Sequence, residues 1–305
     1  MMKSLLEPLD SLKANQHRMI KQLHELCELN SGSTHLEGLA AVSKSLQTMF
    51  HPIADDIKQC KLPAFSTVNM NGETVMQSSG DALYIRKRPQ LKRRVLLCGH
   101  MDTVYGVNHP FQTMNYLDEN TINGPGVADM KGGLIVILHA LCAFENSAYA
   151  TELGWDVIIN TDEEIGSPAS GALLAKLARV AQAGLVYEPA MTAEGLLAKN
   201  RKGSGKLTLI AQGKAAHAGR SFAEGRNALC YLCEALTKIH ALNGLKEGVT
   251  INIGLVSGGE ALNVVPEHAV AKLDVRISQP QDEAWVRMQL DNIIEKMQRK
   301  DYSLS

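Results

Sequence analysis

The sequence predicts an α/β fold in two domains, with a mostly parallel mixed sheet over residues 1–199 and an α+β domain over residues 200–305. Three observations lead to this prediction. The length of 305 residues matches about two domains. Apolar strand-like runs alternate with helical patterns as far as residue 187, which is typical of a largely parallel sheet. Beyond Asn200 the order changes to strand, helix, strand, strand, helix.

The first domain opens with two predicted helices. Residues 12–29 carry apolar side chains at helical spacing. Thr34 and Glu37 then fit a capping box, which begins a second helix that ends near Phe50. The rest of the domain alternates between expected strands at 64–68, 82–86, 95–98, 155–160 and 183–187 and expected helices at 131–144 and 170–182.

The second domain follows the order of a ferredoxin-like split βαβ unit. We expect strands at 205–213, 248–259 and 268–278 and helices at 225–242 and 282–298. The chain stops at Ser305, before the closing strand of such a unit, so we expect a C-terminally truncated chain.

Composition argues against several classes of partner. The net charge is −1 and the pI is about 6.8, so no basic excess points to nucleic acid or to an anionic membrane surface. The longest apolar stretch, 134–144, is too short to cross a bilayer and contains His139. The first residues lack the apolar core of a signal peptide. These features predict a cytoplasmic protein without a nucleic-acid or membrane partner.

Cys230 and Cys233 form a C-x-x-C sequence inside a helical pattern. Zinc or redox sites built on this motif normally have a second Cys or His pair nearby, and none lies beside it here. We therefore expect both thiols to lie in a hydrophobic core.

Acidic residues and one histidine follow the predicted strands. His100 and Asp102 end one strand, Glu163 and Glu164 follow the next, and Glu188 follows a third, while Asp129 lies in a glycine-rich turn before a helix. Each could be a turn residue, a helix cap or a solvated carboxylate. Because sites in α/β sheets form at the carboxyl ends of strands, their joint placement predicts a divalent metal site.

Several motifs resemble a known family of metallopeptidases. They are "GHMDTV", "GPGVADMKGG", "TDEEIGS", "YEP", "GKAAHAGRSFAEGRNA" and "LNVVP". The sequence is similar to acetylornithine deacetylase, succinyl-diaminopimelate desuccinylase, the aminoacylases and, most closely, glutamate carboxypeptidase. The resemblance implies a phosphorylase/hydrolase-like catalytic layer and a ferredoxin-like dimerisation, or lid, domain.

The resemblance also implies roles for these residues. His100 and Glu188 would bind one metal, Asp129 would bridge two metals, Glu164 would bind the second, Glu163 would be the general base, and Asp102 would hold the His100 imidazole. The metals would be two Zn²⁺ ions, with Co²⁺ or Mn²⁺ as alternatives. Glu163 and Glu164, if extended, would point to opposite sides. A cis bond between Asp129 and Met130 is a further implication.

The second domain would add residues that act on substrate. By resemblance, His217 would reach a neighbouring subunit's site and stabilise an oxyanion, and Asn263 would contact substrate. Arg276 could clamp a substrate carboxylate. The expected partners are a second copy of the chain and a small molecule or peptide with a free carboxylate.

The function implied is hydrolysis of an amide bond in an N-acyl amino acid or a C-terminal glutamyl peptide. In the family a last histidine completes the second metal's shell, and no histidine follows His268 here. One metal site would therefore be incomplete. The alternative is a truncated, catalytically impaired relative that acts only in binding or dimerisation.

Overall fold

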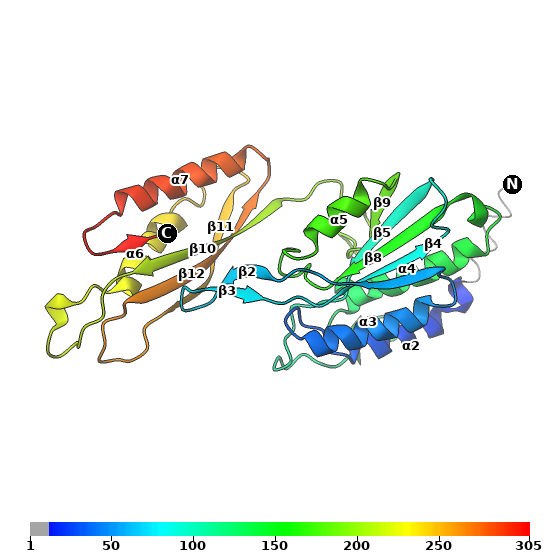
Figure 1. The fold of residues 1–305 in the computed structure, drawn as a ribbon, viewed down its shortest axis with the longest axis horizontal. Coiled ribbons are helices and arrows are strands. Elements are labelled where there is room, and N and C mark those ends of the chain that lie inside the picture. The colour runs from blue at the N-terminus through cyan, green and yellow to red at the C-terminus, as the bar shows by residue number, and fades with distance from the viewer. Residues whose placement is uncertain (1–11) are drawn as a thin grey trace. The chain divides into compact units, whose positions relative to one another are not determined.

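The computed structural model describes residues 12–305, which form two compact units (Figure 1). The first unit contains the described residues up to Phe65 together with Gln77–Leu196. The second contains Ser66–Met76 and Leu197–Ser305. Residues 66–76 precede the predicted domain boundary at residue 200, yet they belong to the second unit.

A five-stranded sheet in the order β1-β4-β8-β5-β9 forms the centre of the first unit. Its strands are β1 (Asp56–Cys60), β4 (Ala82–Lys87), β8 (Gly154–Asn160), β5 (Arg94–His100) and β9 (Ala183–Val186). Strands β8, β5 and β9 are parallel, whereas β1 and β4 pair antiparallel. The predicted mixed α/β sheet is confirmed, and its parallel part is the part that ends in the predicted ligands.

Helices cover both faces of this sheet. One face packs against α2 (Gln16–Cys27), α3 (Leu36–Phe50) and α4 (Gly132–Glu145), and the other against α5 (Gly171–Ala178). Every residue of β8 is buried, because helices lie on both sides, and this explains its apolar run Val157–Ile159. The predicted capping box is wrong, because α3 has His35 as its N-cap and no side-chain cap bond.

Residues 127–145 are long and apolar enough to cross a membrane by length and composition alone. In the structure, however, Leu134 and Ile137 of this segment are fully buried in the core of the first unit. The same segment begins with a distorted turn, Val127–Lys131, that leads into α4. Its apolar character is thus that of a core helix.

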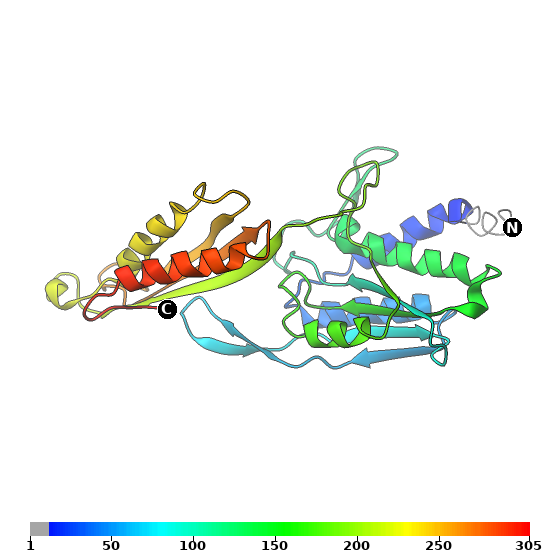
Figure 2. The same cartoon turned by 90° about the horizontal axis from the view of Figure 1, so that it is seen from above.

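The second unit has a four-stranded sheet in the order β11-β12-β10-β13. Strands β10 (Gly203–Gln212), β11 (Thr250–Gly258) and β12 (His268–Ile277) pack against α6 (Ala228–His240) and α7 (Asp282–Lys296), which lie on the same face (Figure 2). The expectation that the closing strand is absent needs correction. Residues Ser303–Leu304 form a short strand, β13, that pairs antiparallel with β10.

The hairpin of β2 (Phe65–Val68) and β3 (Thr74–Gln77) reaches the other face of this sheet. Its Gly72 has a φ of 82°, and a Cβ added there would lie 3.1 Å from Ile210 Cγ2 and 3.3 Å from Val270 Cγ2. Val270 is completely buried. This contact explains why the hairpin groups with the second unit.

The cysteines of α6 also differ from the prediction. Cys230 and Cys233 are exposed, because the buried face of α6 consists of residues such as Tyr231, Leu232 and Ala235. The remaining short elements are the strands β6 (Asn115–Tyr116) and β7 (Ile122–Asn123) and 3₁₀ turns at Ala150–Glu152 and Phe222–Glu224.

Candidate metal centre

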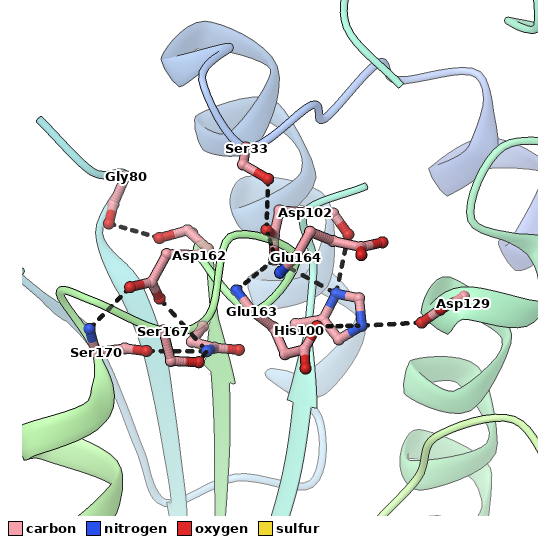
Figure 3. A network of polar contacts seen from close by, with 12 residues as sticks. Ser33, Gly80, His100, Asp102, Asp129, Asp162, Glu163, Glu164, Ser167 and Ser170 are labelled. Atoms are coloured by element: carbon pink, nitrogen blue, oxygen red, sulfur yellow. Dashed lines mark hydrogen bonds and ion pairs between the residues drawn. The ribbon is translucent and has the colours of Figure 1, made fainter. Parts of the chain in front are cut away.

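The carboxyl ends of the three parallel strands bring one imidazole and several carboxylates together (Figure 3). His100 is the last residue of β5. Glu163 and Glu164 lie in the turn that follows β8, and Glu188 follows β9 by two residues. Asp129 comes from the distorted turn before α4. Five of the residues predicted from sequence therefore converge on one place.

The His100 Nε2 atom lies at the centre of this group. It is 3.0 Å from Asp129 Oδ1, 3.8 Å from Glu188 Oε1 and 3.9 Å from Glu163 Oε2. Two triplets, His100 with Glu163 and Glu188 and His100 with Asp129 and Glu164, have ligand atoms within 4.8 Å of one another. Glu163 thus lies at ligand distance itself, so these distances do not separate the predicted base from the predicted ligands.

The spacing fits a small cation. Ligand bonds of about 2.0–2.2 Å in a tetrahedral shell put neighbouring ligand atoms about 3.4 Å apart. The distances from His100 Nε2 bracket this value. Nitrogen and carboxylate oxygen are also a donor set that zinc accepts. The residues present therefore fit a divalent metal.

The protonation of His100 leads to the same conclusion. Its ring is 1% exposed, and Nδ1 lies 2.9 Å from the carbonyl oxygen of Asp102, so Nδ1–H donates there. Burial would lower the His100 pKa, but hydrogen bonds with Asp102 and Asp129 and the charges of Asp102 and Glu188 raise it to about 11. The Nε2 atom is thus surrounded by acceptors that favour a cation, which can be a proton or a metal ion.

Asp102 does more than the single task predicted for it. Its Oδ1 is 3.3 Å from His100 Nδ1, so it lies against the imidazole. Its two carboxylate oxygens also accept the backbone N–H groups of Glu163, at 3.2 Å, and Glu164, at 3.1 Å. Ser33 Oγ donates to the same carboxylate at 2.7 Å. This fully buried acid therefore connects the histidine with the loop that carries both glutamates.

A buried lysine, Lys131, connects the turn that carries Asp129 to α2. Gly126 adopts a φ of 74°, and the Asp129–Met130 peptide bond is cis, as the resemblance implied. Lys131 is 1% exposed, and its Nζ donates to the carbonyls of Leu26 and Leu29 at the C-terminus of α2. Burial lowers the Lys131 pKa to about 8. A cation at a helix C-terminus is favourable, so this contact fixes the turn to α2.

Glu163 and Glu164 do not form the extended segment that was expected. They lie in a turn closed by a 2.7 Å bond from Gly166 N to Glu163 O. Both carboxylates nevertheless reach the centre. Burial and the nearby charge of Asp129 raise the Glu164 pKa to about 7.

The residues predicted in the second unit fall into two groups. His217 and Asn263 lie on neighbouring loops, because Val264 forms a β-bridge with His217 and Ala218 N donates to Asn263 O at 2.9 Å. Arg276 lies near the other end of β12, where it pairs with Ser204. It is exposed, and its Nε donates to Asp274 at 2.8 Å. Arg276 is therefore separated from the other two along the strand.

Sequence reasoning missed two residues that shape the centre. Ser33 holds Asp102, and Lys131 holds the Asp129 turn. For Asp162 the sequence left solvation or a backbone contact open, and its carboxylate accepts backbone N–H groups of the loop that carries Glu163 and Glu164. A lysine inside an apolar, glycine-rich run is a signal that could have drawn attention to Lys131. Ser33 gave no comparable signal.

The chain is similar in sequence to several known metallopeptidases. Residues 200–301 match the M20 peptidase dimerisation domain. The chain is 27% identical over 271 residues to carboxypeptidase G2 of Pseudomonas sp., covering 88% of this chain and 61% of the relative. It is 30% identical over 243 residues to succinyl-diaminopimelate desuccinylase of Corynebacterium glutamicum, covering 75% of this chain and 62% of the relative.

A solved structure shows the same fold. The M20 family metallo-carboxypeptidase Sso-CP2 of Sulfolobus solfataricus superposes with a TM-score of 0.64 at 15% identity, over 94% of this chain and 77% of that one. Residues 200–301 thus carry an M20 peptidase dimerisation domain, and the chain as a whole is similar to metallopeptidases of the M20 family. It spans about three fifths of the length of the two curated relatives named above.

Proposed function

We propose that this protein hydrolyses amide bonds with the help of zinc. The observation that carries the proposal is the convergence of His100, Asp129, Glu163, Glu164 and Glu188 at the carboxyl edge of the sheet. A bound divalent ion lowers the pKa of water and polarises a carbonyl group.

The side chains at this edge would have three different roles: proton transfer, metal binding and positioning. Glu163, which is about half exposed, takes the proton from the attacking water and returns it to the leaving nitrogen. His100, Asp129, Glu164 and Glu188 would hold the divalent metal. Asp102 fixes the ring of His100 and the backbone of Glu163 and Glu164.

The proposed substrates are N-acyl amino acids and peptides with a free C-terminal carboxylate. The relatives named carboxypeptidase and desuccinylase support this class. Arg276 is an exposed guanidinium that can bind such a carboxylate. We further propose a homodimer through the second unit, in which the neighbouring His217 and Asn263 serve the partner's site.

One observation supports the alternative of an impaired relative that only binds or dimerises. Both ligand triplets use His100, and one Nε2 atom can bind one ion. Among the described residues near the centre, the other triplet members are all carboxylates, which hold zinc less well than a mixed shell.

The test is a hydrolysis screen of N-acyl amino acids and C-terminal glutamyl peptides with zinc-loaded protein, combined with metal analysis. Turnover that disappears in Glu163→Gln, with zinc still bound, would support the proposed hydrolase. Bound zinc without turnover on any substrate would favour the alternative. Protein that binds no zinc would refute the proposed hydrolase.

A further inference from the structure

The loop between β8 and α5 is anchored by Asp162, the first of three consecutive acids. Asp162 is completely buried. Its Oδ2 accepts the backbone N–H group of Ser170 at 2.9 Å (Figure 3). The same oxygen accepts the backbone N–H group of Ala169 at 2.7 Å, and Ser167 N donates to the carbonyl oxygen of Asp162 at 2.7 Å. Its carboxylate therefore satisfies the backbone where α5 begins, rather than facing a metal.

Polar side chains complete this anchor. Asn160, the last residue of β8, donates to Ser170 Oγ at 2.9 Å, to Ser167 Oγ at 3.2 Å and to Asp162 Oδ1 at 3.4 Å. Asn160 and Ser170 are also buried. The end of β8 and the start of α5 are thus joined through one buried network, and Asp162 is its only acid.

The two glutamates lie between two such anchors. On one side Asp102 accepts the N–H groups of Glu163 and Glu164. On the other side Asp162 fixes the return of the loop at Ala169 and Ser170. A side chain in a loop keeps its direction only if the backbone on both sides is fixed.

We propose that Asp162 is a positioning residue, which sets the direction of the Glu164 and Glu163 carboxylates by fixing the C-terminal end of their loop. This inference rests on the proposed function only in assuming that these carboxylates serve a metal. Replacing the carboxylate leaves the N–H groups of Ala169 and Ser170 without an acceptor in a buried place, so the loop has to rearrange. Loss of a residue that orients metal ligands typically weakens metal binding by about 10–100-fold.

The experiment measures zinc affinity by competition with a chromophoric chelator, with thermal unfolding recorded for every protein. Asp162→Ala removes the anchor, whereas Asp162→Asn keeps one oxygen that can accept both N–H groups. We expect a graded loss, with zinc affinity about 10–100-fold weaker in Asp162→Ala and only a few-fold weaker in Asp162→Asn.

Asp282→Ala is the matched control. Asp282 is a buried acid at the start of α7 in the second unit and accepts the backbone N–H of Gln279 at 3.1 Å. Its loss should lower the unfolding temperature without changing zinc affinity. The proposal is overturned if Asp162→Ala binds zinc within twofold of the wild type, or if Asp282→Ala loses as much affinity.

The hydrolysis screen, run on the same variants, separates this proposal from the proposed function. A graded zinc series in a protein that hydrolyses nothing would retain the positioning role and reject the hydrolase. Normal hydrolysis together with equal zinc affinities in all variants would retain the hydrolase and reject the positioning role of Asp162.

Discussion

A buried ion-pair network at the centre of the first sheet gives a quantitative test of the fold that carries the metal centre. Asp156 of β8 is 4% exposed and accepts bonds from Arg94 Nε at 2.7 Å, Arg94 Nη2 at 2.6 Å, Arg86 Nε at 3.1 Å and Tyr84 OH at 3.0 Å. Breaking a buried pair on one side costs about 3–5 kcal/mol. Arg94 also donates to the carbonyls of Arg88 and Trp155, so it keeps some partners when Asp156 is replaced. We therefore expect Asp156→Asn to lower the free energy of unfolding by about 3 kcal/mol, the low end of this range.

The destabilisation caused by Asp156→Asn should decrease at low pH. Burial would raise the Asp156 pKa, but the bonds from Arg94 and Arg86 outweigh it and lower the pKa below its usual value of 3.8. A lowered pKa means that the stabilisation is complete above about pH 4 and is lost as the pH falls through the folded-state value. The difference between wild type and Asp156→Asn should therefore shrink below about pH 4.

The assay is urea unfolding followed by tryptophan fluorescence. The chain has two tryptophans, Trp155 in β8 and Trp285 in α7, so a Trp285→Phe background reports on the first unit. In the same unit, Lys58→Gln breaks the pair of an exposed lysine with Asp56, and it should lower the free energy of unfolding by less than about 1 kcal/mol. A loss below about 1 kcal/mol for Asp156→Asn at pH 7, or a difference that does not change with pH, would refute this reasoning.

Four further predictions concern the centre and the second unit. Glu163→Gln should lower hydrolysis by about 10²–10⁴-fold while zinc stays bound, and steady-state rates close to wild type would remove Glu163 from the mechanism. Dialysis followed by metal analysis should find about one tightly held zinc per chain, because both triplets share one imidazole; two retained ions would reveal another ligand. Light scattering should detect a homodimer, and a monomer at high concentration would contradict the proposed partner. Gly72→Ala should destabilise the second unit by about 1–2 kcal/mol, because Gly72 has a left-handed φ and an added Cβ would lie close to Val270. Urea unfolding followed by Trp285 fluorescence measures this, and an unchanged unfolding midpoint would contradict the contact with Val270.

The strand-end residues could be predicted from sequence because their placement follows from topology. Parallel strands end at the same edge, so His100, Glu163 and Glu188 had to meet once the apolar runs before them were recognised as neighbouring strands. No knowledge of side-chain contacts was needed. The order of the second unit was equally visible, since its long helices and strands keep clear apolar periods.

What the sequence did not reveal depends on contacts between distant segments. The β2–β3 hairpin is short and largely exposed, and its tip contacts Val270, about two hundred residues away in the chain. Cys230 and Cys233 lie in a helix whose buried face could not be distinguished from its exposed face by composition alone. Asp162 becomes an anchor only because Gly166 and Ser167 adopt positive φ angles and turn the loop back to α5.

The net charge of the centre bears on how many divalent cations it can bind. Of the acids at this edge, Asp102 and Asp162 are satisfied by backbone N–H groups. Four carboxylates then remain around His100, those of Asp129, Glu163, Glu164 and Glu188. Fully ionised they carry a charge of −4, and one zinc leaves −2. A second divalent cation held by carboxylates would offset the rest. Because the described residues at this edge offer such a cation no second imidazole, it should exchange on dialysis while the first ion stays bound.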